Sequence, residues 1–78
     1  MNLESFKSIC ETTFEDYKEP YITDNIKNID DTLNQYSKDV FTIYNKKHNA
    51  NIDLNSDLEF SSILADYNKK LRIFYSNL

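Results

Sequence analysis

Apolar residues in the middle of the chain recur with the period of an α-helix. Between Thr23 and Lys47 they alternate at steps of three and four: Ile26, Ile29, Leu33, Tyr36, Val40 and Ile43. This spacing lines one side of a helix. We therefore predict a central helix over 23–47, with Thr23 and Asp24 as its cap and first turn.

The segments on either side carry matching apolar stripes. A first helix, capped by Asn2 or Ser5 and running to about Lys18, has the stripe Leu3, Phe6, Cys10, Thr13 and Tyr17, widened by Ile9 and Phe14. It ends at Glu19 because Pro20 disfavours a helical conformation in the residue before it. A third helix opens with a Ser56–Glu59 capping box, and its stripe is Phe60, Ile63, Leu64, Tyr67, Leu71, Phe74 and Leu78, with Tyr75 at the edge.

Three amphipathic segments joined by short connections predict an all-α fold. We expect residues 1–78 to form a single domain, a small antiparallel three-helix bundle with up-down-up order. The composition supports helices, since the chain has no Gly and one Pro. A turn-rich β-sandwich or barrel would need residues with positive φ. At 40% hydrophobic residues, the chain is also too apolar to stay disordered.

Cysteine content and hydropathy bear on the compartment. Cys10 is the only cysteine, so no internal disulfide can form, as expected in a reducing compartment. The sequence has no apolar run long enough for a membrane span and no secretory leader pattern. We expect a cytoplasmic protein without a membrane partner, in a bacterial or infected host cell. The abundance of Asn, Ile, Lys and Tyr resembles the codon bias of AT-rich genomes, including those of some phages.

Candidate catalytic and metal-binding patterns are weak. Asp53, Asn55 and Asp57 alternate like the first ligands of a calcium loop, but Leu58 occupies the position that requires Gly, and Leu64 the position that requires a carboxylate. No motif places His48, the only histidine, as a base beside a nucleophile. The sequence therefore predicts no enzyme, no metal site and no cofactor.

The net charge of −4 gathers in part on one side of the first helix. A helical projection places four carboxylates together, away from the apolar stripe: Glu4, Glu11, Glu15 and Glu19. They form either a solvated face or a docking surface for a basic protein. Antiparallel packing would bring the cations of the third helix toward the acidic end of the bundle and neutralise part of it. The groups concerned are Lys69, Lys70 and Arg72, facing Glu15, Asp16, Glu19 and Asp24.

A second set of candidate contact residues is apolar. The chain has six tyrosines, a residue type enriched at protein interfaces. Tyr21 lies in a predicted connection and Tyr75 at a stripe edge, whereas Ile73 and Leu58 point away from their stripe. Phe41 falls on the polar side of the central helix, so either the third helix or another molecule must cover it.

These observations favour a nonenzymatic protein-binding module. The most concrete form is a small phage- or virus-type inhibitor, acting in anti-defence or host takeover, that sterically blocks a larger host protein with a basic surface. Alternatives are an antitoxin or bacteriocin-immunity protein, a self-assembling helical homodimer, and a nucleic-acid-binding regulator that uses Lys69, Lys70 and Arg72. The acidic net charge disfavours nucleic acid as a partner.

Overall fold

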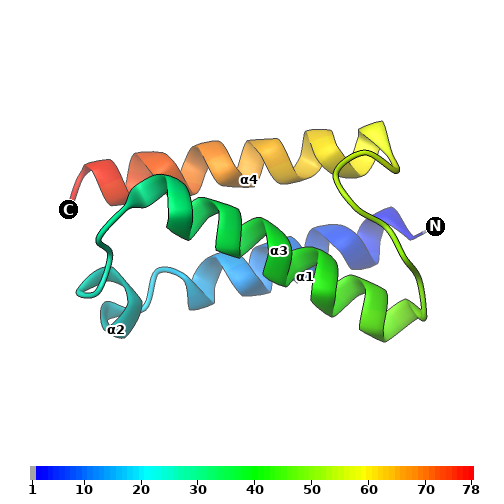
Figure 1. The fold of residues 1–78 in the computed structure, drawn as a ribbon, viewed down its shortest axis with the longest axis horizontal. Coiled ribbons are helices and arrows are strands. Elements are labelled where there is room, and N and C mark those ends of the chain that lie inside the picture. Colours follow the sequence, from blue (N-terminus) through cyan, green and yellow to red (C-terminus); the bar gives the residue numbers. More distant parts are fainter. Residues whose placement is uncertain (1) are drawn as a thin grey trace.

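Residues 2–78, which the computed structural model describes, form three long helices and one short one. They are α1 (Leu3–Asp16), α2 (Pro20–Thr23), α3 (Ile29–His48) and α4 (Leu58–Ser76). Each long helix packs against the other two, and these residues contain no strand. Figure 1 shows α1 and α4 running in one direction and α3 in the other. The predicted antiparallel bundle with up-down-up order is therefore confirmed.

A polar side chain just ahead of each long helix accepts hydrogen bonds from the free N–H groups of its first turn. Asn2 accepts from Ser5 N at 3.0 Å, and Asn28 accepts from Asp31 N at 3.2 Å. Asp57 accepts from the N–H groups of Glu59 and Phe60 at 2.8 and 3.0 Å. The predicted cap at Asn2 is confirmed. The predicted cap at Ser56 is wrong by one residue, because the Ser56 hydroxyl bonds to Asp53 instead.

The predicted central helix over 23–47 is interrupted near its start. Pro20 begins the short helix α2, and the Thr23 hydroxyl donates back to the Pro20 carbonyl instead of capping the next helix. Residues 24–28 are not helical, and α3 begins only after Asn28 caps it. Ile26 therefore lies in a connection, where it is half-buried. The apolar repeat thus extends across the start of α3, which is determined by the Asn28 cap and not by the repeat.

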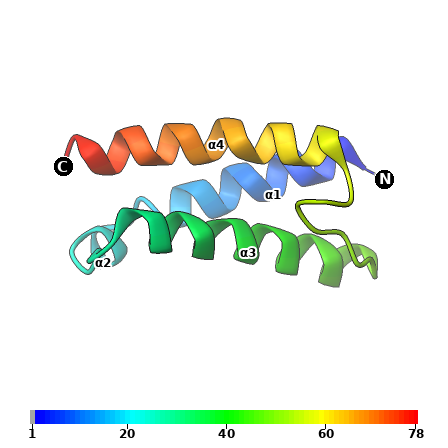
Figure 2. The ribbon, with the colours of Figure 1, turned by 45° about the horizontal axis from the view of Figure 1, so that its top comes forward.

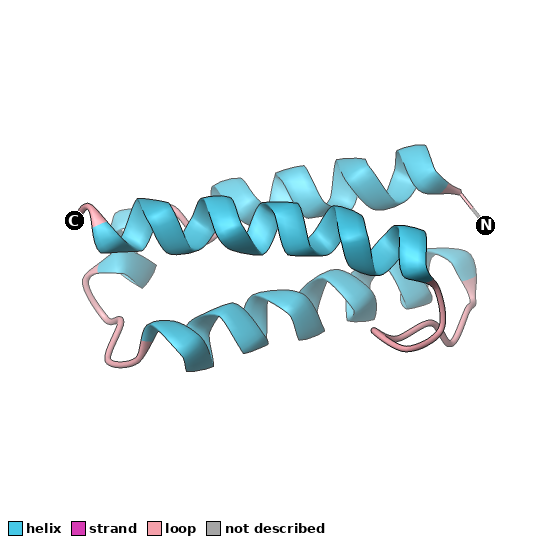
Figure 3. Ribbon diagram, turned by 90° about the horizontal axis from the view of Figure 1, so that it is seen from above, coloured by secondary structure: helices cyan, strands magenta, loops and turns pink. Residues whose placement is uncertain are grey.

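The first helix is also slightly shorter than predicted. It ends at Asp16, and the N–H of Lys18 bonds to the Glu15 carbonyl three residues back, so the chain turns before Pro20. This places Glu19 outside α1, as the N-cap residue of α2 in extended conformation. Figure 3 shows the connections between the long helices at the two ends of the bundle.

The core is an aromatic cluster centred on Phe6 of α1. Its ring stacks on Phe60 of α4 with centroids 4.2 Å apart, and the α3 rings of Phe41 and Tyr44 lie at 5.5 and 5.6 Å. Most of the predicted stripe residues are buried or half-buried around this cluster. Three predicted stripe residues are exposed instead: Leu3, Ile43 and Leu78. Leu3 and Leu78 lie at or beyond helix ends, where no neighbouring helix covers them.

The connection between α3 and α4 is held down by one amide side chain. Asn45 donates to the Ile52 carbonyl at 2.8 Å and accepts from the Ile52 N–H at 2.9 Å. These two bonds imitate those of a backbone pairing and keep Ile52 against the core. Figure 2 shows this connection folding back toward α3 before it rises to α4.

Asn49 ends α3 in the left-handed conformation, with φ 51° and ψ 50°. We expect Asn49→Gly to raise the free energy of unfolding by about 0.5 kcal/mol, because Gly adopts this conformation without a Cβ clash. Asn49→Val should lower it by roughly 1–2 kcal/mol, since a β-branched residue fits this region poorly. Urea unfolding followed by circular dichroism measures both. Equal stability of the two variants would contradict the expectation.

Candidate interaction surface

Three carboxylates line the outward side of α1: Glu4, Glu11 and Glu15, named here the α1 carboxylate row. All three are exposed, and their separations of seven and four residues keep them on one side of the helix. Glu19, predicted to extend this row, is exposed but lies outside the helix, so its position no longer follows the helical repeat. The structure thus keeps three of the four predicted acids together on one regular element.

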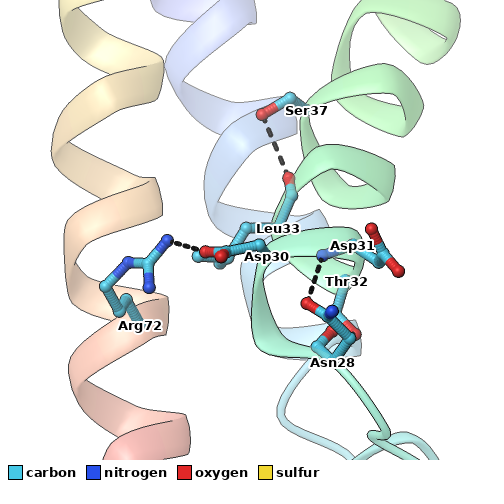
Figure 4. A network of polar contacts seen from close by, with 7 residues as sticks. All are labelled: Asn28, Asp30, Asp31, Thr32, Leu33, Ser37 and Arg72. Atoms are coloured by element: carbon cyan, nitrogen blue, oxygen red, sulfur yellow. Dashed lines mark hydrogen bonds and ion pairs between the residues drawn. The ribbon is translucent and has the colours of Figure 1, made fainter.

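The expected neutralisation of this row by α4 is absent. Residues 2–78 contain two ion pairs, Glu15 with Lys18 at 3.6 Å and Asp30 with Arg72. Figure 4 shows the second pair joining α4 to the start of α3. Lys70 instead lies over the Tyr67 ring, 5.2 Å from its centre. Arg72 and Lys70 therefore have other neighbours, and the row faces solvent.

Lys18 is the cation that pairs with the row; Lys7, one turn from Glu4 and from Glu11 on α1, is exposed and makes no ion pair within residues 2–78. The Lys18 ammonium lies 5.3 Å from the centre of the Phe14 ring and 5.4 Å from that of Phe74, besides its contact with Glu15. Lys18 lies just beyond the end of α1, where it offsets the charge of Glu15 and also contacts α4 through Phe74. An exposed pair at 3.6 Å contributes little to stability.

The apolar candidates divide into exposed and buried residues. Tyr21 is 80% exposed at the bundle end next to α2, and Ile73 is 54% exposed on α4. Phe41 is only 7% exposed and belongs to the core, where its ring lies 5.5 Å from that of Phe6 on α1. Tyr75 is 5% exposed, and its hydroxyl donates to the Tyr17 carbonyl at 2.7 Å. In this conformation neither Phe41 nor Tyr75 is available to a partner.

Most tyrosine hydroxyls join the helices to one another. Tyr36 donates to the Cys10 carbonyl at 2.8 Å, Tyr17 donates to the Asp39 carboxylate, and Tyr44 accepts from the Asn2 N–H. The abundance of tyrosine, read from the sequence as a sign of an interface, is therefore mainly a property of the core. Tyr21 is the exposed exception.

Cys10 and His48, two residues with reactive side chains, make contacts within the helical bundle. Burial raises the pKa of the Cys10 thiol to about 12, which keeps it protonated and weakly nucleophilic at neutral pH. The exposed Ser5 hydroxyl lies 2.7 Å from His48 Nε2, and the imidazole packs on the Tyr44 ring with centroids 4.4 Å apart. This contact joins the start of α1 to the end of α3. Residues 2–78 hold no cluster of three metal-ligating side chains.

A shallow polar groove between α3 and α4 was not predicted. It comprises adjoining hollows of about 680 and 380 Å³ that share Asn34 and Asn68. Ser37 and Asn68 bond across it at 2.9 Å, while Asn68 Oδ1 is buried without a partner. The sequence offered one signal, the many asparagines on the predicted helices. The groove is open to solvent, and nothing in its geometry selects a ligand.

No protein-family model, no curated protein and no solved structure matches this chain. Within residues 2–78, no helix has the length and apolar character required to cross a membrane.

Proposed function

We propose that this chain is a nonenzymatic protein-binding module that contacts a basic surface of a larger protein through the α1 carboxylate row. Its concrete form is a small inhibitor of the phage or virus type, which covers a functional surface of a host protein and blocks it sterically. The observation that carries the proposal is the exposure of these carboxylates without cations from α3 or α4 opposite them.

Carboxylates in this state are suited to pairing with an external cation. Glu4 and Glu11 make no ion pair within residues 2–78, so a partner would displace no internal contact from them. They stand on a helix that is packed against two others, which limits the conformational entropy lost on binding. Opposite charges across an interface accelerate encounter and select the partner more than they raise affinity.

Tyr21 supplies an aromatic anchor near the same end of the bundle as Glu15 and Glu19. Its ring is mostly exposed, and neither its ring nor its hydroxyl makes an internal aromatic contact or hydrogen bond within residues 2–78. Exposed tyrosines are frequent hot spots because they bury a large area with few rotatable bonds. A steric inhibitor requires this combination of a rigid charged face and an anchor, and it requires no catalytic group.

Neutralising the row should weaken partner binding without weakening the fold. The double variant Glu11→Gln/Glu15→Gln should bind the partner about two- to thirtyfold more weakly, as expected for two exposed ion pairs. Its free energy of unfolding should rise by a few tenths of a kcal/mol, since like charges four residues apart on a helix repel. The partner is identified by capture from host lysate with mass spectrometry, and its affinity is then measured by calorimetry.

A matched control separates a local effect from net charge. The variant Asp31→Asn/Thr42→Lys also changes the net charge from −4 to −2, but on α3, and it should bind with unchanged affinity. Equal weakening by both variants would show that only total charge matters. Undiminished binding by the α1 variant would show that the row is merely solvated.

A further inference from the structure

The outward side of α4 carries an exposed stripe that contacts no other helix. We name Leu58, Ser62, Ala65, Lys69 and Ile73 the α4 outer stripe; all five are exposed. Leu58 is 88% exposed and Ile73 54% exposed, although both are large and apolar. Steps of three and four residues keep the stripe on one side of the helix, opposite the buried residues Leu64 and Leu71.

The two large apolar residues lie near the two ends of this stripe. Leu58 and Ile73 are separated by about 22 Å along the axis, at 1.5 Å per residue. Ala65 lies close to the midpoint and is small enough to let another helix approach. A second helix with apolar residues at the same separation, running in the opposite direction, would cover both anchors at once.

We propose that the occupant of this stripe is a second copy of the chain, with the two α4 helices packed antiparallel about a two-fold axis between Ala65 and Asp66. Leu58 then contacts Ile73 of the second copy, and Ile73 contacts Leu58 of the second copy. Ser62 lies opposite Lys69. Such an isologous arrangement makes every contact twice and closes after two chains.

Charge complementarity supports this pairing and its direction. Glu59 and Lys70 are exposed on the same flank of the stripe. In antiparallel packing this flank faces the same flank of the second copy. Measured along the helix axis, Glu59 then lies within about 3 Å of Lys70 of the second copy. Two opposite-charge pairs result. Parallel packing would turn this flank away from its own copy and keep Glu59 and Lys70 roughly 16 Å apart along the axis, so neither pair could form.

Two features limit the strength of this dimer. Asp66 lies beside the two-fold axis and faces Asp66 of the second copy, so the two carboxylates repel each other. Lys69 and Lys70 are close enough to offset this repulsion in part. The apolar contact consists of only two Leu–Ile pairs, so the buried area is below that of a standard stable interface. We therefore expect a weak, concentration-dependent dimer. The α1 carboxylate row lies on a different helix and stays free, so the dimer would present two copies of it.

Sedimentation equilibrium of the purified chain, from low micromolar to near-millimolar concentration, tests the association. The wild type should move from monomer to dimer over this range, and Leu58→Asp or Ile73→Asp should raise the dissociation constant at least tenfold. Leu54→Asp is the matched control, because Leu54 is 53% exposed but lies outside α4, and it should have no effect. A monomer at all concentrations, or equal weakening by the control, would overturn the proposal.

Crosslinking tests the antiparallel register. A mixture of Leu58→Cys and Ile73→Cys chains should form mainly the mixed disulfide, and Ala65→Cys should crosslink to itself. The buried Cys10 does not interfere. Self-crosslinking of Leu58→Cys as the main product would indicate parallel packing and overturn the proposal.

Charge reversal tests the predicted ion pairs. Glu59→Lys and Lys70→Glu should each weaken the dimer a fewfold, and the double variant should restore it. Because no partner is present, failure here leaves the proposed function standing.

Discussion

Replacing Phe6 with Ala should remove most of the folding stability of this protein. The ring is fully buried and contacts Phe60 of α4 and two aromatic rings of α3, so its loss opens a cavity where all three long helices meet. Phe→Ala changes in protein cores cost about 3–5 kcal/mol. The whole domain is expected to have roughly 4–12 kcal/mol, at 0.05–0.15 kcal/mol per residue. Thermal and urea unfolding, followed by circular dichroism at 222 nm, give the change.

Two controls on the same helix bracket this result. Leu3→Ala removes an exposed side chain and should change stability by less than about 0.5 kcal/mol. Phe14→Ala removes a half-buried ring that packs on Tyr67 and should have an intermediate effect. If Phe6→Ala unfolds at the same urea concentration as Leu3→Ala, the aromatic cluster is not the centre of the core.

Raising the pH should unfold the protein between about pH 10 and 12, in the range where buried tyrosines are forced to ionise. Burial raises the pKa of Tyr75 to about 12. It also raises the pKa of Tyr36 and of Tyr17, where the Asp39 carboxylate adds to the effect. In the unfolded chain these phenols lose their protons near pH 10, before the folded chain does. The native state then binds more protons, so stability is complete below pH 10 and is lost as the pH rises.

Absorbance at 295 nm reports tyrosinate formation, and circular dichroism reports the helices. Most of the tyrosinate signal should appear in a cooperative step that coincides with the loss of helical signal. In concentrated denaturant the same titration should follow the ordinary phenol pKa of about 10 without cooperativity. Full ionisation of the tyrosines with intact helices would contradict the burial of these hydroxyls.

The periodicity of apolar residues predicted the bundle because each long helix buries one side. Phe6, Tyr36 and Leu64 lie in the core for the reason the pattern gave. The break before α3 was not predicted, since Ile26 and Ile29 fit one continuous repeat while the Asn28 side chain ends it. Local hydrogen bonding at a cap acts over three residues, and a hydrophobic period averaged over twenty does not detect it.

The candidate surface was predictable where exposure follows from a single helix. The row formed by Glu4, Glu11 and Glu15 is exposed because it lies opposite the apolar stripe of α1. Tyr75 was wrongly counted among the contact residues, and the choice between core and interface stayed open for Phe41. The burial of both depends on where a neighbouring helix lies, which one helical projection does not contain. The ion-pair partner of Arg72 likewise depends on how the helices are placed, since Arg72 reaches Asp30 at the start of α3.

The hydrogen bonds of the buried Tyr36 and Tyr75 hydroxyls affect which positions can change during evolution. Tyr36 and Tyr75 donate to main-chain oxygens, and every residue type supplies such an oxygen. The side chain at position 10 can therefore change, as far as its volume allows, without loss of the bond from Tyr36, whereas Tyr17 is constrained by its own hydroxyl, which donates to Asp39. The donors have no such freedom, because a change to Phe would remove the hydroxyl. In divergent sequences with this architecture, we expect tyrosine to persist at 36 and 75 while residue 10 varies.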